Sequence, residues 1–188
     1  MGQMKPFPNK KYQIIYADPP WLYDNAGCQK SRGMARGSFP CMPLDDIKKL
    51  CVPSAENAML FLWATMPKLR EALEVIGAWG FKYITCAFVW VKQNPSGFGI
   101  YSGLGHWVNG NAELCLLGRK GKTLERKNKS IKQIVLYPRG RHSEKPPIIR
   151  EHIVKLLGDL PRIELFASQR TKGWDVWGNE VESNNELF

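Results

Sequence analysis

A short stretch near the amino end, Asp18-Pro19-Pro20-Trp21, combines residue types that suit an aromatic amine. Each proline fixes its own φ and restricts the residue before it, so Asp18 is held extended at a stiff corner. Pro19 lacks an N–H but keeps its carbonyl, so the corner offers two acceptors to the two hydrogens of an NH₂ group. Trp21 could stack a flat ring, worth about 1–3 kcal/mol for a base. From composition alone, the alternative is a proline-rich turn with a buried tryptophan and a capping aspartate.

The corner must be positioned by the segment before it, Tyr12–Ala17, an apolar run typical of a buried strand. The same kind of pattern predicts further strands at residues 58–64, 81–92, 112–118, 133–137 and 162–167. Helices are predicted at residues 44–50, 67–80 and 146–157. Strands that alternate with helices predict an α/β sheet with helices on its faces, as one domain over residues 1–188. Such sheets bind ligands where their strands end.

The predicted helices also carry apolar residues at helical spacing, which should mark the sides that pack on the sheet. In the second helix these are Leu69, Leu73 and Ile76. In the third they are Ile149, Ile153 and Leu156.

The 188-residue chain carries a formal net charge of +10, which by itself suits either a polyanionic partner such as nucleic acid or a simple solubility charge. The distribution favours nucleic acid, because the basic residues gather in two segments, about 118–132 and 138–145, whose glycine, serine and asparagine content predicts surface loops. We take these loops as candidates for the nucleic-acid contact. Residues of about 23–40 are rich in glycine and are predicted to form a mobile loop.

Several classes of protein are disfavoured by what the sequence lacks. No apolar run approaches the roughly 20 residues that span a bilayer, and the amino end lacks the apolar core of a signal peptide. Five cysteines without a C-x-x-C pair, and three scattered histidines, predict neither a disulfide framework nor a metal site. A cytoplasmic location, no membrane contact and no metal are therefore expected.

Seven segments in order resemble the MT-A-seventy family, S-adenosylmethionine-dependent methyltransferases that act on the N6 amine of adenine. They are IIYADPPW, FLW (residues 61–63), VWVK (89–92), GHWVNGNAELCLLG (105–118), HSEKP (142–146), RIELFA (162–167) and GWDVWGNE (173–180). The family contains the catalytic subunit of the mRNA adenosine methyltransferase and many bacterial and phage enzymes. The resemblance covers about residues 11–180. It implies a Rossmann-like fold with a central, mostly parallel sheet, the catalytic motif first in the chain and the cofactor strand last.

The resemblance also implies site residues. The catalytic residues would be Asp18, Pro19, Pro20 and Trp21. Those that bind S-adenosylmethionine, and its product S-adenosylhomocysteine, would be Asp18, Lys145, Glu164, Phe166, Ser168, Arg170, Thr171, Asn179 and Glu180. Those that bind the substrate would be Trp21, Phe39, Trp107, Asn109, Glu113 and Lys145.

The chain departs from the family pattern after ELFA, where Ser168 stands at the usual place of an arginine. Arg170 or Thr171 is the candidate to replace it. At the amino end, Phe7 or Asn9 is the candidate to contact the adenine of the cofactor.

The expected reaction is methyl transfer to N6 of adenine, with DNA favoured because the chain is compact and lacks RNA-binding extensions. The same reaction on RNA is the alternative, and a homo- or heterodimer partner is left open. A non-catalytic nucleic-acid-binding or partner subunit is the alternative of another class. It is disfavoured because such relatives lose the acidic motif, which is intact here. Cytosine-directed relatives usually carry serine in place of Asp18, which favours adenine.

Overall fold

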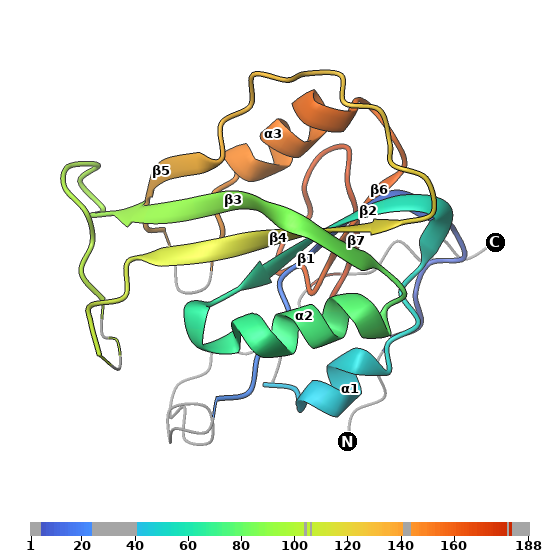
Figure 1. The fold of residues 1–188 in the computed structure, drawn as a ribbon, viewed down its shortest axis with the longest axis horizontal. Helices are drawn as coiled ribbons and strands as arrows, with labels where there is room; N and C mark the ends of the chain where they lie inside the picture. The colour runs from blue at the N-terminus through green and yellow to red at the C-terminus, as the bar shows by residue number, and fades with distance from the viewer. Residues whose placement is uncertain are drawn as a thin grey trace.

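A seven-stranded sheet forms the centre of the computed structural model, which describes residues 5–23, 41–103, 105, 107–140, 144–179 and 181 (Figure 1). The strands lie in the order β5-β3-β4-β2-β1-β6-β7. They are β1 (Tyr12–Ala17), β2 (Ser54–Ala64), β3 (Lys82–Gln93), β4 (Ala112–Lys120), β5 (Ile134–Pro138), β6 (Arg162–Leu165) and β7 (Asp175–Trp177).

One strand runs against the others. β1 pairs in parallel with β2 and β6, β6 with β7, and β3 with β5, whereas β4 is antiparallel to both β2 and β3. The carboxyl ends of six strands and the amino end of β4 therefore meet at one edge of the sheet. We call this the carboxyl edge, and the opposite one the amino edge.

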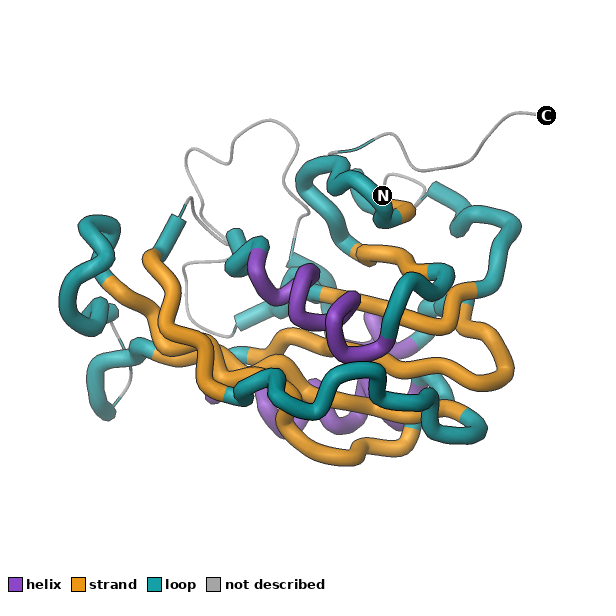
Figure 2. Tube along the Cα trace, turned by 90° about the horizontal axis from the view of Figure 1, so that it is seen from above, coloured by secondary structure: helices purple, strands orange, loops and turns teal. Residues whose placement is uncertain are grey.

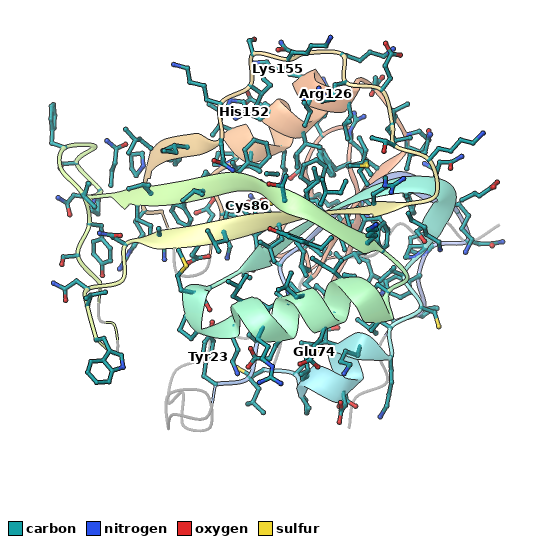
Figure 3. The ribbon with its side chains drawn as sticks, in the orientation of Figure 1. Tyr23, Glu74, Cys86, Arg126, His152 and Lys155 are labelled. Carbon is teal, nitrogen blue, oxygen red and sulfur yellow. The ribbon has the colours of Figure 1, made fainter. Side chains whose placement is uncertain are left out.

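Helices cover both faces of the sheet. α1 (Leu44–Lys48), the 3₁₀ turn η1 (Met66–Lys68) and α2 (Leu69–Ala78) lie on one face, and α3 (Ile148–Leu157) lies on the other (Figures 1 and 2). The labelled side chains Glu74 on α2 and Lys155 on α3 accordingly stand on opposite sides of the sheet (Figure 3).

Strand β1 shows why the sequence of this region is continuously apolar. Side chains alternate between the faces of a strand, and here Ile15 and Ala17 pack in the core under α1 and α2, while Ile14 and Tyr16 pack in the core under α3. A strand buried on both faces needs apolar residues at every position. The same alternation assigns Asp18, the next residue, to the α3 face.

The predicted fold class is confirmed: the sheet is mostly parallel, helices flank it, and the catalytic motif follows the first strand. Every predicted helix and strand exists, with ends shifted by several residues at most. The sequence missed β7, whose three residues are too few to show a period. The strand expected to bind the cofactor, β6, is therefore the last but one.

Two packing predictions need correction. On α2 the buried residues are Ala72, Val75 and Ile76, whereas Leu69 and Leu73 are about 36% and 40% exposed. Ile76 is buried as predicted, whereas the two leucines fall at the border of the buried stripe.

On α3, Ile149 and Ile153 are buried as expected, but Leu157 takes the fully buried place predicted for Leu156. Leu156 is only partly buried against the same core.

The cysteines give a mixed outcome. Cys51, Cys86 and Cys115 are free, as suits a chain expected to have no disulfide framework, but Cys41 is disulfide-bonded, which the sequence did not predict. None of the described helices is long and apolar enough to cross a membrane. The predicted loop of residues 23–40 lies, apart from its first residue, outside the described part of the chain.

Candidate active site

The corner after β1 is held by its own backbone. The N–H of Trp21 donates to the Pro19 carbonyl at 2.9 Å, and the N–H of Met42 donates to the Pro20 carbonyl at 2.8 Å. The Pro19 carbonyl therefore already accepts one hydrogen bond and has one lone pair left for a ligand. Asp18 is only partly buried, with a side chain 29% exposed.

Asp18 ends a chain of four alternating charges. The Lys145 ammonium donates to Asp18 Oδ2 at 2.6 Å and lies 3.2 Å from Glu113 Oε2. The other oxygen of Glu113, Oε1, lies 2.6 Å from the Lys92 ammonium. Lys145 and Glu113 are the inner members, with side chains only 9% and 12% exposed. We call Asp18, Lys145, Glu113 and Lys92 the charge chain.

The tertiary structure assembles this chain from distant segments. Lys145 lies 127 residues from Asp18 and stands just before α3, which brings it onto the α3 face of the sheet. Because β4 runs antiparallel to its neighbours, Glu113 near its amino end reaches the same carboxyl edge where β1 ends. Two buried indoles form the floor: Lys145 Nζ lies 5.6 Å from the Trp63 ring, and Lys92 Nζ lies 5.1 Å from the Trp90 ring.

The pKa values follow from burial and from this order of charges. Burial by itself would lower the pKa of Lys145, but the Asp18 and Glu113 carboxylates outweigh it, and the net pKa is raised. Burial raises the pKa of Asp18 against the opposing effect of Lys145, and the Glu113 carboxylate adds to the rise. For Glu113, burial is outweighed by its two lysine neighbours, which lower its pKa. Lys145 thus stays charged, and it is the group that favours the ionised form of Asp18.

Trp21 lies inside the core in this structure. Only 6% of it is exposed, it packs with the residues under α1 and α2, and its indole N–H donates to the Trp63 carbonyl at 3.2 Å. Trp21 therefore stabilises the corner and presents no open ring face. This position of Trp21 matches the alternative that the sequence left open, a proline-rich turn with a buried tryptophan.

Glu164 is engaged in a buried ion pair. Arg150 Nε donates to Glu164 Oε2 at 2.7 Å, and Arg150 Nη2 donates to Oε1 at 2.6 Å, with both side chains about 10% exposed. A ribose hydroxyl, the partner that the resemblance implies for Glu164, would have to compete with this bidentate pair. In the structure Glu164 ties β6 to α3.

The ends of β6 and β7 form a tight double turn. Phe166 adopts a left-handed backbone with φ of 61°, and the Ala167 N–H donates to the Trp177 carbonyl at 3.0 Å. A Cβ on Gly178 would lie 2.2 Å from the Ala167 carbonyl oxygen, so only glycine fits there. Ser168 and Asn179, the residues that follow on each side, are both exposed at this edge.

The amino-terminal segment closes the far side of this turn. The Phe7 ring lies 4.4 Å from the Trp177 ring, and the Trp177 indole donates to the Lys5 carbonyl at 2.9 Å. Lys5 Nζ in turn donates to the Val181 carbonyl at 2.9 Å. Phe7, one of the two amino-terminal candidates, is thus next to the turn that carries Asn179, and Asn9 is exposed.

These surroundings fit an adenosyl cofactor. Exposed hydroxyl and amide groups at the carboxyl ends of two adjacent parallel strands are where α/β sheets hold nucleotides, and an aromatic ring stands beside them.

Other predicted site residues are scattered or lie outside the described chain. Arg170 is exposed and Thr171 partly buried in the segment after β6. Trp107, in the connection between β3 and β4, is 98% exposed, and Asn109 is exposed too. Phe39 and Glu180 fall outside the described residues.

The two basic segments are also separated. Residues 118–120 belong to β4, which leaves the sheet at the amino edge, and Lys127 N–H donates to the Leu156 carbonyl at the carboxyl end of α3. The segment 138–145 instead follows β5 at the carboxyl edge and includes Lys145.

Sequence reasoning missed Lys92, Arg150 and Trp63 as parts of the site. Lys92 and Trp63 lie inside the segments VWVK and FLW that carried the resemblance, so their place at strand ends could have flagged them. Arg150 gave no signal, because a charged residue on an amphipathic helix is normally solvated.

An open, mostly parallel α/β sheet with nucleotide-type groups and a carboxylate corner at its carboxyl edge defines the class of Rossmann-like methyltransferases. A model of the MT-A70 family matches residues 12–180. The chain belongs to the MT-A70 family.

Similar proteins come from bacteria, plants and animals. The chain is 36% identical over 197 residues to the type II methyltransferase M.MunI of a Mycoplasma species, across 94% of this chain and 81% of that protein. It is 30% identical to a probable N(6)-adenosine-methyltransferase MT-A70-like protein of Oryza sativa and 28% identical to the human N(6)-adenosine-methyltransferase catalytic subunit METTL3. The chain spans 23% and 28% of the length of these last two proteins.

Proposed function

We propose that this protein transfers the methyl group of S-adenosylmethionine to the exocyclic N6 amine of adenine in nucleic acid, with DNA as the favoured substrate. The observation that carries the proposal is the Asp18 carboxylate, held at the end of β1 by Lys145 and left partly open. Family membership and the names of the related methyltransferases support the same reaction.

The adenine amine is a weak nucleophile because its lone pair is delocalised into the ring. Asp18 Oδ1 has no hydrogen-bond partner among the described residues, and the Pro19 carbonyl has a free lone pair, so each can accept one amine hydrogen. Accepting both hydrogens favours the pyramidal amine, whose lone pair is then localised for attack. Because these acceptors are fixed in advance by the proline corner and by Lys145, little reorganisation is needed.

When bound, S-adenosylmethionine supplies an electrophilic methyl group. Ser168 and Asn179 would hold its ribose, and Arg170 or Thr171 would replace the family arginine there. Phe7 would lie beside its adenine, and Lys145 near its amino-acid end. Glu164 would act indirectly, by fixing β6 against α3 through Arg150.

DNA is favoured because the chain is 36% identical to the type II methyltransferase M.MunI and only 28% identical to the human N(6)-adenosine-methyltransferase catalytic subunit. RNA is the second candidate, since those relatives are named for adenosine. A dimer partner and a cytoplasmic location stay predictions.

The test is methyl transfer from labelled S-adenosylmethionine to unmethylated DNA and RNA, single- and double-stranded, followed by mass spectrometry of the nucleosides. We expect N6-methyladenine from one polymer, and a loss of about 10²-fold or more in rate for Asp18→Asn with cofactor binding retained. Near-normal turnover by Asp18→Asn would refute the assignment of Asp18. A wild-type chain that binds the cofactor but methylates neither polymer would refute the proposed function.

A further inference from the structure

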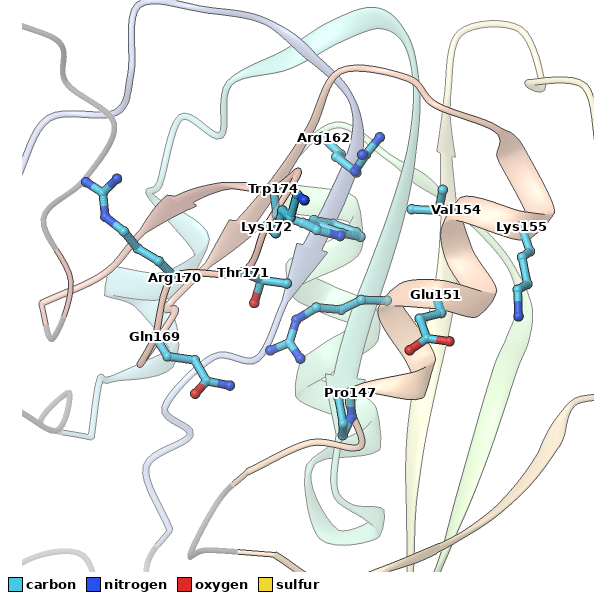
Figure 4. Close-up of a pocket in the computed structure, with 11 residues that line it drawn as sticks. Pro147, Glu151, Val154, Lys155, Arg162, Gln169, Arg170, Thr171, Lys172 and Trp174 are labelled. Atoms are coloured by element: carbon cyan, nitrogen blue, oxygen red, sulfur yellow. The ribbon is translucent and has the colours of Figure 1, made fainter.

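A surface pocket begins beside the candidate active site and extends along α3. A pocket of about 700 Å³ lies between α3 and the segment that connects β6 to β7 (Figure 4). α3 provides one wall with Glu151, Val154 and Lys155, and residues 169–172 face it from the other side. We call this feature the α3 groove.

The α3 groove is longer than a site at the strand ends requires. Pro147, at its start, follows Lys145 by two residues, whereas Lys155 lies in the last turn of α3 and Arg162 begins β6 at the amino edge. The eight steps along the backbone from Pro147 to Lys155 rise about 12 Å along the helix axis. The groove therefore runs from the catalytic corner along the flank of the sheet, beyond the reach of a molecule bound at the carboxyl edge alone.

Its described lining is strongly cationic. The basic residues are Arg150, Lys155, Arg162, Arg170 and Lys172, and Glu151 is the one acidic residue among the described lining. Lys155 and Lys172 are exposed and have no ion-pair partner within the described chain. Two like charges left unpaired beside one groove favour an anionic ligand.

Arg162 and Trp174 complete the lining of the groove. Arg162 pairs with Asp159 at 2.6 Å, yet its Nε is buried and has no hydrogen-bond partner among the described residues. Its guanidinium lies 5.7 Å from the buried Trp174 ring, which fixes it in place. Gln169 and Thr171 add neutral polar groups to the facing wall.

We propose that the α3 groove binds consecutive backbone phosphates of the nucleic-acid strand that carries the target adenine. This rests on the proposed function for the identity of the polymer. Phosphates recur about every 3.4 Å along the axis of a duplex strand, so a groove of about 12 Å suits three or four of them. A polymer can place one nucleotide at the reacting centre while its neighbouring phosphates lie along the rest of the groove. Contacts to phosphates hold the strand in register without reading its sequence.

The test compares two double variants that each remove two positive charges. Lys155→Gln with Lys172→Gln empties the groove of its unpaired cations. Lys11→Gln with Lys82→Gln is the matched control, because both lysines are exposed at the amino edge, where β1 and β3 begin, and neither lines the groove or belongs to the two basic segments. The probe is a fluorescent adenine-containing oligonucleotide, as DNA duplex and as single-stranded RNA, titrated over a series of salt concentrations. Binding of S-adenosylmethionine is measured in parallel by calorimetry.

For the groove variant we expect the slope of log affinity against log salt to fall by about 1.8 on duplex DNA, and affinity to weaken on the order of tenfold. The control should keep the wild-type slope, and both should bind the cofactor as the wild type does. Equal slopes for the two variants would overturn the inference. So would weaker cofactor binding with an unchanged slope, which would make the groove a cofactor site, or the absence of nucleic-acid binding by the wild type.

The proposed function is judged separately, by methyl transfer with the wild-type chain. If the wild type methylates adenine but the groove variant keeps the wild-type salt slope, the proposed function holds and the proposed phosphate site is refuted. If the wild type binds nucleic acid through the groove but transfers no methyl group, the phosphate site holds and the proposed function is refuted.

Discussion

Replacing Lys145 by methionine should change how the reaction depends on pH, because Lys145 is the only group of the charge chain that favours ionised Asp18. Its ammonium lies 2.6 Å from Asp18 Oδ2, and the lysine side chain is only 9% exposed. An opposite charge at this range lowers a carboxyl pKa by about 1–3 pH units. Without it, burial and Glu113, which both raise the pKa of Asp18, act unopposed.

The sign of the change is fixed by these causes. The ionised carboxylate of Asp18 is a stronger acceptor for the amine hydrogen than the protonated acid, so the acid limb of the kcat/KM profile reports its pKa in the free enzyme. In Lys145→Met the limb should move to higher pH, because the neighbour that lowers the pKa of Asp18 has been removed. In Glu113→Gln it should move down, because a carboxylate that raises the pKa of Asp18 has been removed. At neutral pH the Lys145→Met rate should fall about 10²-fold or more.

Methyl transfer from labelled S-adenosylmethionine, followed across pH, measures both variants. Lys48→Met is the matched control: Lys48 pairs with Glu74 at 3.2 Å between α1 and α2, and its loss should leave the profile unchanged. If Lys145→Met is too slow to profile, carboxyl NMR of Asp18 gives the same pKa directly. A shift of both variants in the same direction, or no shift in Lys145→Met, would refute this reading of the charge chain.

Two further predictions concern the scaffold that carries the site. Arg150→Leu should lower the free energy of unfolding by about 3–5 kcal/mol, since it leaves the buried Glu164 carboxylate unpaired. The double variant Arg150→Leu with Glu164→Leu should recover most of this loss. Urea denaturation measures both variants, and an equal loss of stability in the two would contradict the pairing. Gly178→Ala places a Cβ 2.2 Å from the Ala167 carbonyl and should weaken S-adenosylmethionine binding about tenfold or more, by calorimetry. Gly77→Ala on α2 is the control, because a Cβ added at Gly77 would meet no atom within 4 Å. It should stabilise the chain by up to about 1 kcal/mol. Unchanged cofactor affinity in Gly178→Ala would remove the double turn from the cofactor site.

The sequence alone determined the elements and the corner. Tyr12–Ala17 is apolar at every position because β1 is buried on both faces, and the two prolines after Asp18 set a stiff exit by local sterics. Local patterns of this kind are readable because they depend on a few neighbouring residues. The same local reading could not decide whether Trp21 is buried or open, since both uses suit a tryptophan beside two prolines.

Only the tertiary structure decided which charges meet. Lys145 reaches Asp18 from 127 residues away, and Glu113 reaches Lys145 because β4 runs against its neighbours, a property of strand pairing that no local pattern records. Arg150 has the spacing of an ordinary helix residue and finds Glu164 only when α3 packs on β6. Pairing across the sheet depends on topology, and topology is fixed by the whole chain.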